Sequence, residues 1–506
     1  MSTTTSEIPQ APSPAAETRS ASTGDEQGFL RRYTWWLVAL GVLVLSAVIV
    51  RALGTRPGYD PYGWLIWGRE TLSGTLDLGG APSWKPLPYL FTVPYSVFGH
   101  FALWLWMVTA VAISLGGSIF AGRIAYRLTG TDDGTRRFPA IAAALFAGVA
   151  LLGIWQYMHS MFSAQSDTVI TALCLGAIDF HLSRRIRIAF VLLVLAALGR
   201  PEVWPFTGLY GLWLWWKHPS SRWLVCVGFL VIPAMWFGIP TITNHRPFVS
   251  AQLALRSPRE VTGNKVTGVL NRYATLQYLP LQLAALLGFV MAWFRRDRVV
   301  LALGGAAILW VIVEAAFALH GWPAVPRYIY EAEGVTIVIA AVAVGWLLKD
   351  GLELAERYRP GWARPRWIGI ALVTILAVSL VPPAIARLRA EHGDLLHERA
   401  RTKEINLLAG AVNAYGGYKH LRACGEPVTN VEYVSILAWY THLNVGKVGH
   451  RPKFELHQKY PIVMLTQLKN GWAMTPYRTS PSLQASCPHA LFVSTPHRPN
   501  GIYSTG

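Results

Sequence analysis

The apolar run Thr34-Trp-Trp-Leu-Val-Ala-Leu-Gly-Val-Leu-Val-Leu-Ser-Ala-Val-Ile-Val-Arg-Ala-Leu53 decides the class of fold. About 20 apolar residues form a helix long enough to cross the hydrocarbon core of a bilayer. The run has no small-residue cleavage site, so we interpret it as an anchor and not as a removed signal peptide. Similar runs recur along the chain, which predicts a polytopic α-helical membrane protein.

The composition agrees with a membrane protein. Of the 506 residues, 53% are hydrophobic and 14% are charged, and the net charge is +18. In membrane proteins an excess of Lys and Arg gathers in cytoplasmic loops. Because the basic residues are spread over short loops instead of forming one patch, membrane lipids are expected partners and nucleic acid is not.

The apolar runs predict about eleven membrane spans. They lie near residues 34–53, 100–122, 138–157, 168–182, 188–203, 204–217, 223–241, 278–294, 299–319, 334–349 and 367–386. With the N-terminus inside, every predicted inside loop is basic, as the positive-inside rule requires. An odd number of spans places the C-terminal segment outside a plasma membrane.

The chain is expected to have three parts. Residues 1–32 contain few large apolar residues and predict a disordered cytoplasmic N-terminus. Residues 33–386 form the transmembrane domain. Residues 387–506 contain strand-like runs and predict a small extracytoplasmic α/β domain. Cys424 and Cys487 lie in this last part, where an oxidising compartment would allow a disulfide between them.

The segment after the first predicted span contains Asp60 among aromatic residues. A carboxylate at this depth can act as general base on an acceptor hydroxyl, whereas the Asp-Pro pair that it begins is also a turn former. The aromatic neighbours Tyr59, Tyr62 and Trp64 are typical of a sugar-binding surface. Glu70 is a further candidate for substrate binding, although a solvated carboxylate is the ordinary interpretation of such a residue.

Two predicted outside segments place cations next to aromatic residues. Lys85, beside Trp84, is suited to binding a phosphate at the level of the lipid headgroups. The alternative is a lysine whose long side chain only extends from the membrane towards the interface, as is common near the ends of spans. Arg327 can hold a phosphate through paired N–H donors, with Tyr328 at the lipid entrance. The alternative for this pair is an aromatic and basic belt at the membrane interface.

Further polar residues lie at predicted outer ends of spans. Asp167 is either part of a helix N-cap or a second carboxylate facing the outer cavity, and the two roles are compatible. Arg200 and Glu202 are ionisable groups at membrane depth, which indicates either function or a pair that braces two helices. His245 and Arg246 lie in a cationic outside segment, which predicts either an anionic ligand or ordinary solvated charge.

Together these motifs resemble the GT-C superfamily of integral-membrane glycosyltransferases over about residues 34–390, in the branch of protein mannosyltransferases and aminoarabinose transferases. The resemblance implies inverting transfer of a hexose or pentose from a polyprenyl-phosphate donor to a cell-envelope polysaccharide, lipoglycan or protein. It implies Asp60 and Asp167 as catalytic carboxylates, and Lys85 and Arg327 as stabilisers of the leaving phosphate. The first loop lacks the adjacent acidic pair of many members, so a role for Mg²⁺ or Mn²⁺ stays open.

A separate observation supports a donor delivered in the membrane. The predicted cytoplasmic loops are too short for a nucleotide-sugar-binding domain. One alternative is a transporter or flippase of lipid-linked sugars, which would have polar residues through the midplane and internal repeats; the sequence shows no internal repeat. Another is a non-catalytic relative that binds lipid-linked glycans, in which Asp60 would be dispensable while Lys85 and Arg327 would not.

Overall fold

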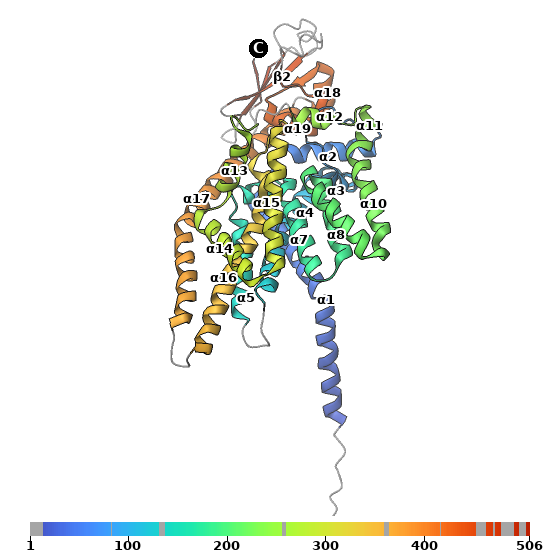
Figure 1. Cartoon of the computed structure of the whole chain (residues 1–506). Coiled ribbons are helices and arrows are strands. Elements are labelled where there is room, and N and C mark those ends of the chain that lie inside the picture. The colour runs from blue at the N-terminus through green and yellow to red at the C-terminus, as the bar shows by residue number, and fades with distance from the viewer. Residues whose placement is uncertain are drawn as a thin grey trace, which may run out of the picture.

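The computed structural model describes residues 14–81, 83–130, 137–255, 260–358, 364–414, 416–451, 462–468, 471–476, 490–494 and 502–505. These residues form a bundle of helices with a β-sheet beyond one end of it (Figure 1). Helix α1 (Pro14–Leu53) includes part of the segment for which the composition predicts disorder. That expectation and the predicted domain boundaries stay predictions.

Six helical stretches in the described residues are long and apolar enough to cross a membrane. They are Tyr33–Leu53, Pro86–Thr129, Pro219–Asn244, Arg298–Leu319, Pro326–Asp350 and Gly369–Ala414. A seventh is formed if α13 (Lys265–Leu276) and α14 (Leu279–Arg295), which meet at a bend of 100°, act as one span. The protein is therefore a multi-pass membrane protein.

The structure does not support eleven full-length spans. Four predicted spans correspond to helices of only 14 to 17 residues: α5 (Phe138–Leu152), α7 (Ser166–Leu182), α8 (Ile186–Gly199) and α9 (Trp204–Lys217). At about 1.5 Å per residue they reach roughly 21–26 Å, less than the hydrocarbon core of about 30 Å. The count of eleven and the orientation of the termini stay predictions.

Small residues allow the central helices to approach closely. Helix α4 (Ala102–Thr129) packs against α5, and a Cβ on Gly122 would lie 2.9 Å from the carbonyl oxygen of Ala144. Helix α16 (Tyr330–Tyr358) packs against α14, where a Cβ on Gly288 would lie 2.5 Å from the carbonyl oxygen of Ile339. Such close backbone contacts supply the van der Waals packing that holds helices together in lipid.

The polar, aromatic segment after α1 is a helix rather than a loop. Helix α2 (Tyr59–Leu72) lies across the end of the bundle nearest the sheet (Figure 1). The indole N–H groups of Trp64 and Trp67 donate to the carbonyl oxygens of Ser83 and Asp77, at 2.8 and 3.1 Å. These bonds tie the segment that leads to α3 (Pro86–Tyr95) to the buried face of α2.

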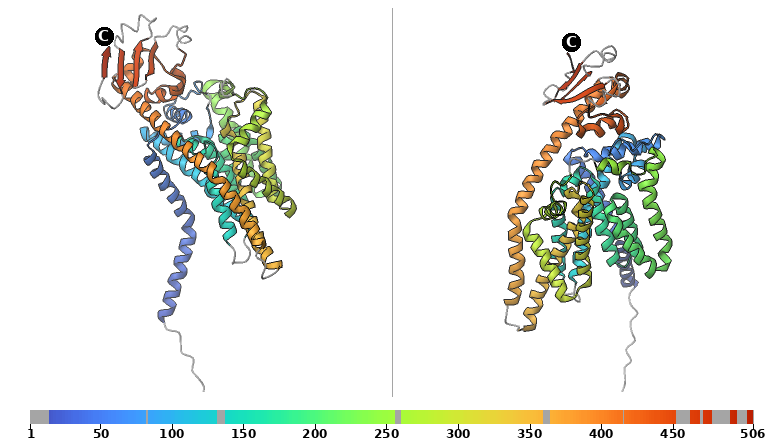
Figure 2. Two further views of the ribbon diagram at one scale, coloured as in Figure 1. Left: turned by 90° about the vertical axis from the view of Figure 1, so that its left-hand side faces the viewer. Right: turned by 45° about the horizontal axis from the view of Figure 1, so that its top comes forward.

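One long helix connects the bundle to the sheet. Helix α17 (Arg364–Ala414) runs along the outside of the bundle and ends at the sheet (Figure 2). The predicted boundary between residues 386 and 387 falls inside it. Beyond that point it contacts the segment after α1, where the backbone N–H of Arg56 donates to Thr402 Oγ1 at 2.8 Å.

The sheet has five strands in the order β1-β2-β3-β4-β5. They are β1 (Glu426–Val428), β2 (Ile462–Leu468), β3 (Gly471–Pro476), β4 (Ala490–Ser494) and β5 (Ile502–Thr505). Strands β1 and β2 are parallel and the remaining pairs are antiparallel, with Leu465 opposite Met474. The indole of Trp472 in β3 donates to the carbonyl oxygen of Glu404 in α17 at 2.9 Å.

The remaining elements connect these parts. The helices are α6 (Tyr157–Phe162), α10 (Arg222–Pro233), α11 (Ile239–Asn244), α12 (Val249–Ala254), α15 (Arg298–Leu319), α18 (Gly417–Cys424) and α19 (Val434–Tyr440). Short helical turns are η1 (Ser96–Phe101), η2 (Pro201–Val203), η3 (Pro219–Ser221), η4 (Ala234–Gly238), η5 (Pro326–Ile329), η6 (Val431–Tyr433) and η7 (Val445–Lys447). Cys487 lies outside the described residues, and with it the predicted disulfide to Cys424.

The C-terminal segment packs directly on α2 through Glu70. Asn444 Nδ2 donates to both carboxylate oxygens of Glu70, at 3.0 and 2.9 Å, and to the carbonyl oxygen of Asp77 at 2.7 Å. Burial raises the pKa of Glu70 from its ordinary value of 4.5 to about 7, against the opposing effect of the hydrogen bond from Asn444. Between pH 4.5 and about 7, Glu70 is therefore protonated in the folded protein and ionised in the unfolded chain.

We expect the stability of the protein to depend on the ionisation of Glu70. The folded-state pKa is raised, so the free energy of unfolding should fall as the pH rises from 4.5 to about 7 and then level off. Glu70→Gln should flatten this part of the profile, as measured by thermal unfolding in detergent between pH 4.5 and 8. The exposed Glu432 provides the control Glu432→Gln. An unchanged profile in Glu70→Gln would contradict the assignment.

Candidate functional site

Five charged side chains from separate segments meet at the end of the bundle that lies under α2. We call them the charged cluster: Asp60 in α2, Lys85 before α3, Asp167 in α7, Arg200 after α8, and Arg327 in η5. All five were singled out from the sequence. The structure shows that they form one connected network of ion pairs.

Asp167 is the centre of the charged cluster. Its Oδ1 lies 3.6 Å from Lys85 Nζ and also contacts Arg200 Nη2, while its Oδ2 lies 3.3 Å from Arg327 Nε. Asp167 is fully buried in the first turn of α7. A buried carboxylate is costly unless it is paired, and here it offsets three cations that would otherwise repel one another.

Local sequence places Lys85 beside α7. Lys85 is the N-cap of α3 with an extended backbone, and Pro86 at the next position begins the helix, a position where proline is already suited to helical geometry. The Lys85 Nζ donates to Ser166 Oγ at 2.8 Å and lies 5.8 Å from the centre of the Trp64 ring. Ser166, the residue directly before Asp167, is thus a direct partner of Lys85.

Arg200 makes the contacts expected of a brace between segments. Besides Asp167, its Nη1 lies 3.6 Å from Glu202 Oε1, and its guanidinium carbon lies 3.7 Å from the centre of the Tyr328 ring. A cation over an aromatic ring is attracted by the ring quadrupole. Arg200 and Glu202 are both buried, so these contacts join the end of α8 to η5. A role of either residue in substrate binding stays a prediction.

Exposure changes across the charged cluster. The side chains of Asp167 and Arg200 are 0% and 2% exposed, whereas those of Lys85, Asp60 and Arg327 are 13%, 17% and 24% exposed. Arg327 Nη2 donates to Asp60 Oδ2 at 3.3 Å. The accessible edge of the charged cluster therefore presents two cations and one carboxylate, supported from within by a buried ion pair.

The aromatic residues predicted to bind sugar are mostly buried. Tyr62, Trp64 and Trp84 are almost fully shielded and pack in the core near α2 and α3, with Trp84 in edge-to-face contact with Tyr89. Tyr59 is partly buried, and its carbonyl oxygen accepts a hydrogen bond from Ser435 Oγ at 2.7 Å. Their contacts stabilise α2, and a substrate-binding role stays a prediction for each.

Three other predicted residues lie outside the charged cluster. His245 and Arg246 are exposed at the turn between α11 and α12. Glu70 binds Asn444 instead. None of the contacts described for the charged cluster involves these residues, so the structure does not bring them together with Asp60, and their substrate-binding roles stay predictions.

The sequence analysis missed one buried acid near the charged cluster. Glu331 follows Arg327 by four residues, and its Oε1 accepts a hydrogen bond from Thr171 Oγ1 at 3.4 Å. Glu314 in α15 is also buried, and neither of its oxygens has a hydrogen-bond partner among the described residues. The signal for Glu331 was available, because a carboxylate in an apolar span is by default a functional candidate.

The charged cluster does not fit a divalent metal. In the part of the chain that the structure describes, no group of three or more His, Cys, Asp or Glu side chains is arranged to hold a metal ion. The carboxylates of Asp60 and Asp167 are engaged by cationic side chains. Anion binding by Lys85 and Arg327 is the chemistry that this arrangement supports.

Comparisons with known proteins give limited information. No family model and no curated protein matches the sequence. Similar solved structures include ArnT from Cupriavidus metallidurans bound to undecaprenyl phosphate, with a TM-score of 0.49, and the same protein in the apo state, with a TM-score of 0.47. Each is 15% identical in sequence, and each match covers 86% of this chain and 93% of that chain. At this level of similarity the function has to be argued from the geometry of the site.

We expect Asp167 to be far more important for stability than Asp60. Asp167→Asn leaves three cations without their central carboxylate, and breaking a buried ion pair costs about 3–5 kcal/mol. Asp60→Asn removes a partly exposed partner, for which about 1 kcal/mol is typical. Thermal unfolding of both variants in detergent should show the larger fall in Tm for Asp167→Asn. Equal losses would contradict the central role of Asp167.

Proposed function

We propose that this protein is a GT-C-type membrane glycosyltransferase that moves a sugar from a polyprenyl-phosphate donor to a hydroxyl group of a cell-envelope acceptor. The observation that carries the proposal is the accessible edge of the charged cluster, where Lys85 and Arg327 lie beside Asp60 at the end of the apolar bundle. At this depth the two cations are suited to binding the lipid phosphate that leaves. The carboxylate beside them is suited to taking the proton of the hydroxyl that attacks.

The phosphate of the donor is assigned to Lys85 and Arg327. Both are partly exposed, and both are held in place by Asp167. Hydrogen bonds from charged donors to phosphate are about twice as strong as neutral ones, and they strengthen as the glycosidic bond breaks and charge moves to the phosphate oxygen. Cations that are already oriented towards the atom where negative charge develops usually supply a large part of an enzyme's rate enhancement.

Asp60 is assigned as the general base. Its ion pair with Arg327 uses Oδ2, and Oδ1 is the atom assigned to take the proton. The acceptor oxygen attacks the anomeric carbon, the bond between that carbon and the phosphate oxygen breaks, and the hydroxyl proton passes to Asp60. The leaving group departs as polyprenyl phosphate, and a single displacement inverts the anomeric configuration.

The arrangement in the membrane completes the proposal. The N-terminus is assigned to the cytoplasm, and the charged cluster and the C-terminal segment to the extracytoplasmic side of the plasma membrane. A sugar delivered on a membrane lipid needs no nucleotide-binding domain, which agrees with the short cytoplasmic loops predicted from the sequence. The donor assay below tests which sugar is transferred, and mannose and arabinose are among the candidates.

A second candidate function is transport of a lipid-linked sugar. One observation favours it: Glu314 and Glu333 are buried in membrane-spanning helices, and their carboxylate oxygens have no hydrogen-bond partner among the described residues. Ionisable residues in such positions often mark ion or proton pathways. A non-catalytic glycan-binding protein is the third outcome that the following experiment distinguishes.

We expect Asp60→Asn to abolish transfer and to leave donor binding intact. Purified protein is tested with a panel of polyprenyl-phosphate sugars and cell-envelope acceptors. Loss of a general base lowers the rate by about 100- to 10,000-fold, whereas Lys85→Met should weaken donor binding itself. Asp350→Asn is the control, because Asp350 pairs with Arg295 on the far side of the bundle.

The other outcomes identify the alternatives. Equal transfer by the wild type and Asp60→Asn would remove Asp60 from the mechanism. Donor binding without transfer by the wild type would favour the glycan-binding protein. Movement of the donor across liposome membranes without any transfer would favour the transporter.

A further inference from the structure

Arg387 in α17 is a buried cation that the proposed mechanism does not use. It is 6% exposed and lies within Gly369–Ala414, one of the helical stretches long and apolar enough to cross a membrane. A charge that is removed from water is costly unless a counter-charge or hydrogen bonds compensate it. The partners of Arg387 therefore decide whether this position is only a brace between helices or also a binding site.

Two aromatic rings hold the guanidinium of Arg387. Its Cζ lies 4.8 Å from the centre of the Trp155 ring and 4.8 Å from the centre of the Tyr278 ring. Its Nε donates a hydrogen bond to Tyr278 OH at 3.2 Å. The rings attract the cation through their quadrupoles, but neither ring has a net charge. These contacts orient the guanidinium and leave its positive charge without a counter-ion.

The two terminal nitrogens of this guanidinium have no partner. Nη1 is buried and forms no hydrogen bond, and Nη2 forms none within the part of the chain that the structure describes. Arginine can bind a phosphate or a carboxylate through two N–H groups at once. The structure therefore presents an oriented pair of charged donors without an acceptor.

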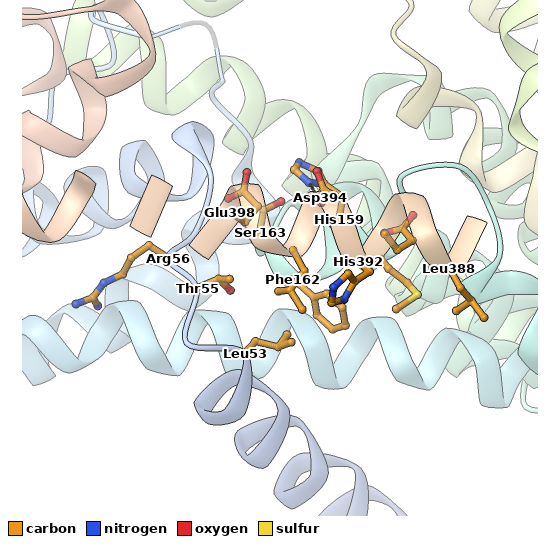
Figure 3. Close-up of a pocket in the computed structure, with 13 residues that line it drawn as sticks. Leu53, Thr55, Arg56, His159, Phe162, Ser163, Leu388, His392, Asp394 and Glu398 are labelled. Carbon is orange, nitrogen blue, oxygen red and sulfur yellow. Dashed lines mark hydrogen bonds and ion pairs between the residues drawn. The ribbon is translucent and has the colours of Figure 1, made fainter. Parts of the chain in front are cut away.

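The first carboxylate after Arg387 on α17 belongs to Glu391, one helical turn further on. Glu391 lines a cavity of about 260 Å³ between α6 and α17, together with His159, Leu388 and His392 (Figure 3). Arg387 does not line this cavity, and the two side chains form no ion pair. Glu391 thus faces the cavity, and it does not supply the counter-charge that Arg387 lacks.

Arg387 lies at the end of a surface that is suited to acyl chains. Tyr278, its hydrogen-bond partner, is the N-cap of α14, and α14 packs against α17. Beyond this point both helices carry exposed apolar side chains: Leu279, Leu283, Leu286, Val381, Ile385 and Leu388. Tryptophan and tyrosine are enriched where the hydrocarbon core meets the headgroups, and basic pockets between membrane helices bind lipid headgroups there.

The site is connected to the helix that follows η5. The carbonyl oxygen of Trp155 accepts a hydrogen bond from Tyr330 OH at 2.9 Å, and Tyr330 is the first residue of α16. The backbone N–H of Trp155 donates to the carbonyl oxygen of Leu276 at 3.0 Å, beside the bend between α13 and α14. A ligand that neutralised Arg387 would therefore stabilise a junction of several helices.

We propose that Arg387 binds the phosphate group of a membrane lipid, whose acyl chains lie along α14 and α17. The phosphate supplies the counter-charge that the described residues do not supply, and the rings of Trp155 and Tyr278 hold the guanidinium ready to receive it. This site is separate from the charged cluster, whose residues make no contact with Arg387. The proposal therefore does not depend on the proposed glycosyltransferase function.

The test is photolabelling of the full-length protein in dodecyl maltoside micelles, which contain no phosphate. The probes are phosphatidic acid and diacylglycerol with the same diazirine acyl chain, so that they differ only in the phosphate. Phosphatidic acid should label peptides of α14 and α17 about tenfold more strongly, the difference expected for a hydrogen bond to a charged group. Equal labelling by the two probes would overturn the proposal.

A competition experiment distinguishes a lipid from free phosphate. Inorganic phosphate at the concentration of the probe should leave the labelling by phosphatidic acid unchanged, because the acyl chains contribute to binding. Displacement of the probe would show that the site takes free phosphate, and the lipid would then be the wrong ligand.

Two neighbouring arginines provide matched variants. Arg387→Gln should lower labelling by phosphatidic acid about tenfold, whereas Arg389→Gln, at an exposed position of the same helix, should not change it. Arg387→Lys keeps the charge but not the forked N–H donors, so it should retain only part of the labelling and should fold if Arg387→Gln does not. Unchanged labelling in both Arg387 variants would refute the site.

Glu391→Gln tests whether the counter-charge comes from the chain itself. If a lipid phosphate neutralises Arg387, the wild type and Glu391→Gln should be labelled equally. If Glu391 pairs with Arg387 in the membrane, labelling should appear only when this carboxylate is removed, and the proposal would be wrong. In the wild type, phosphatidic acid should also raise Tm more than diacylglycerol does, since a ligand that binds only the folded state stabilises it.

Discussion

The ion pairs of Asp167 are the constraint on which the rest of the structure depends. One buried carboxylate holds Lys85, Arg200 and Arg327, which come from segments before α3, after α8 and before α16. Desolvated charges are expensive unless they are paired. The segments that carry these cations must therefore meet at the N-terminus of α7, and the ends of four helical segments are fixed by one side chain.

Within the charged cluster, the buried side chains stabilise the fold, and the side chains nearer the surface are those proposed to react. Asp167 and Arg200 are buried and hold the helices, whereas Lys85, Arg327 and Asp60 reach the accessible edge. A cation that is already oriented by a buried partner needs little reorganisation when an anion arrives. This preorganisation is what a site for phosphate departure requires, and it explains why the strongest ion pairs and the proposed reactive groups lie side by side.

The C-terminal part of the chain completes the environment of α2. Ser435 donates to the carbonyl oxygen of Tyr59, and Asn444 holds Glu70 further along the same helix. Helix α17 links this part to the bundle, since Trp472 of the sheet donates to its backbone and Arg399 binds the end of α1. Helix α2, which carries Asp60, is thus held between the bundle and the C-terminal segment (Figures 1 and 2).

The sequence by itself determined that this is a multi-pass membrane protein, and it identified each residue of the charged cluster. Both inferences depend on local patterns: apolar runs of span length, and ionisable residues where the membrane makes them costly. The number of full-length spans could not be obtained in this way, because an apolar run does not reveal where α7 or α8 ends. Only the tertiary structure decided which charges meet, that α2 is a helix with buried aromatic residues, and that α6 and α17 enclose a cavity. The ion pair between Asp60 and Arg327 joins residues 267 positions apart, and packing over such separations leaves no periodic signal in the chain.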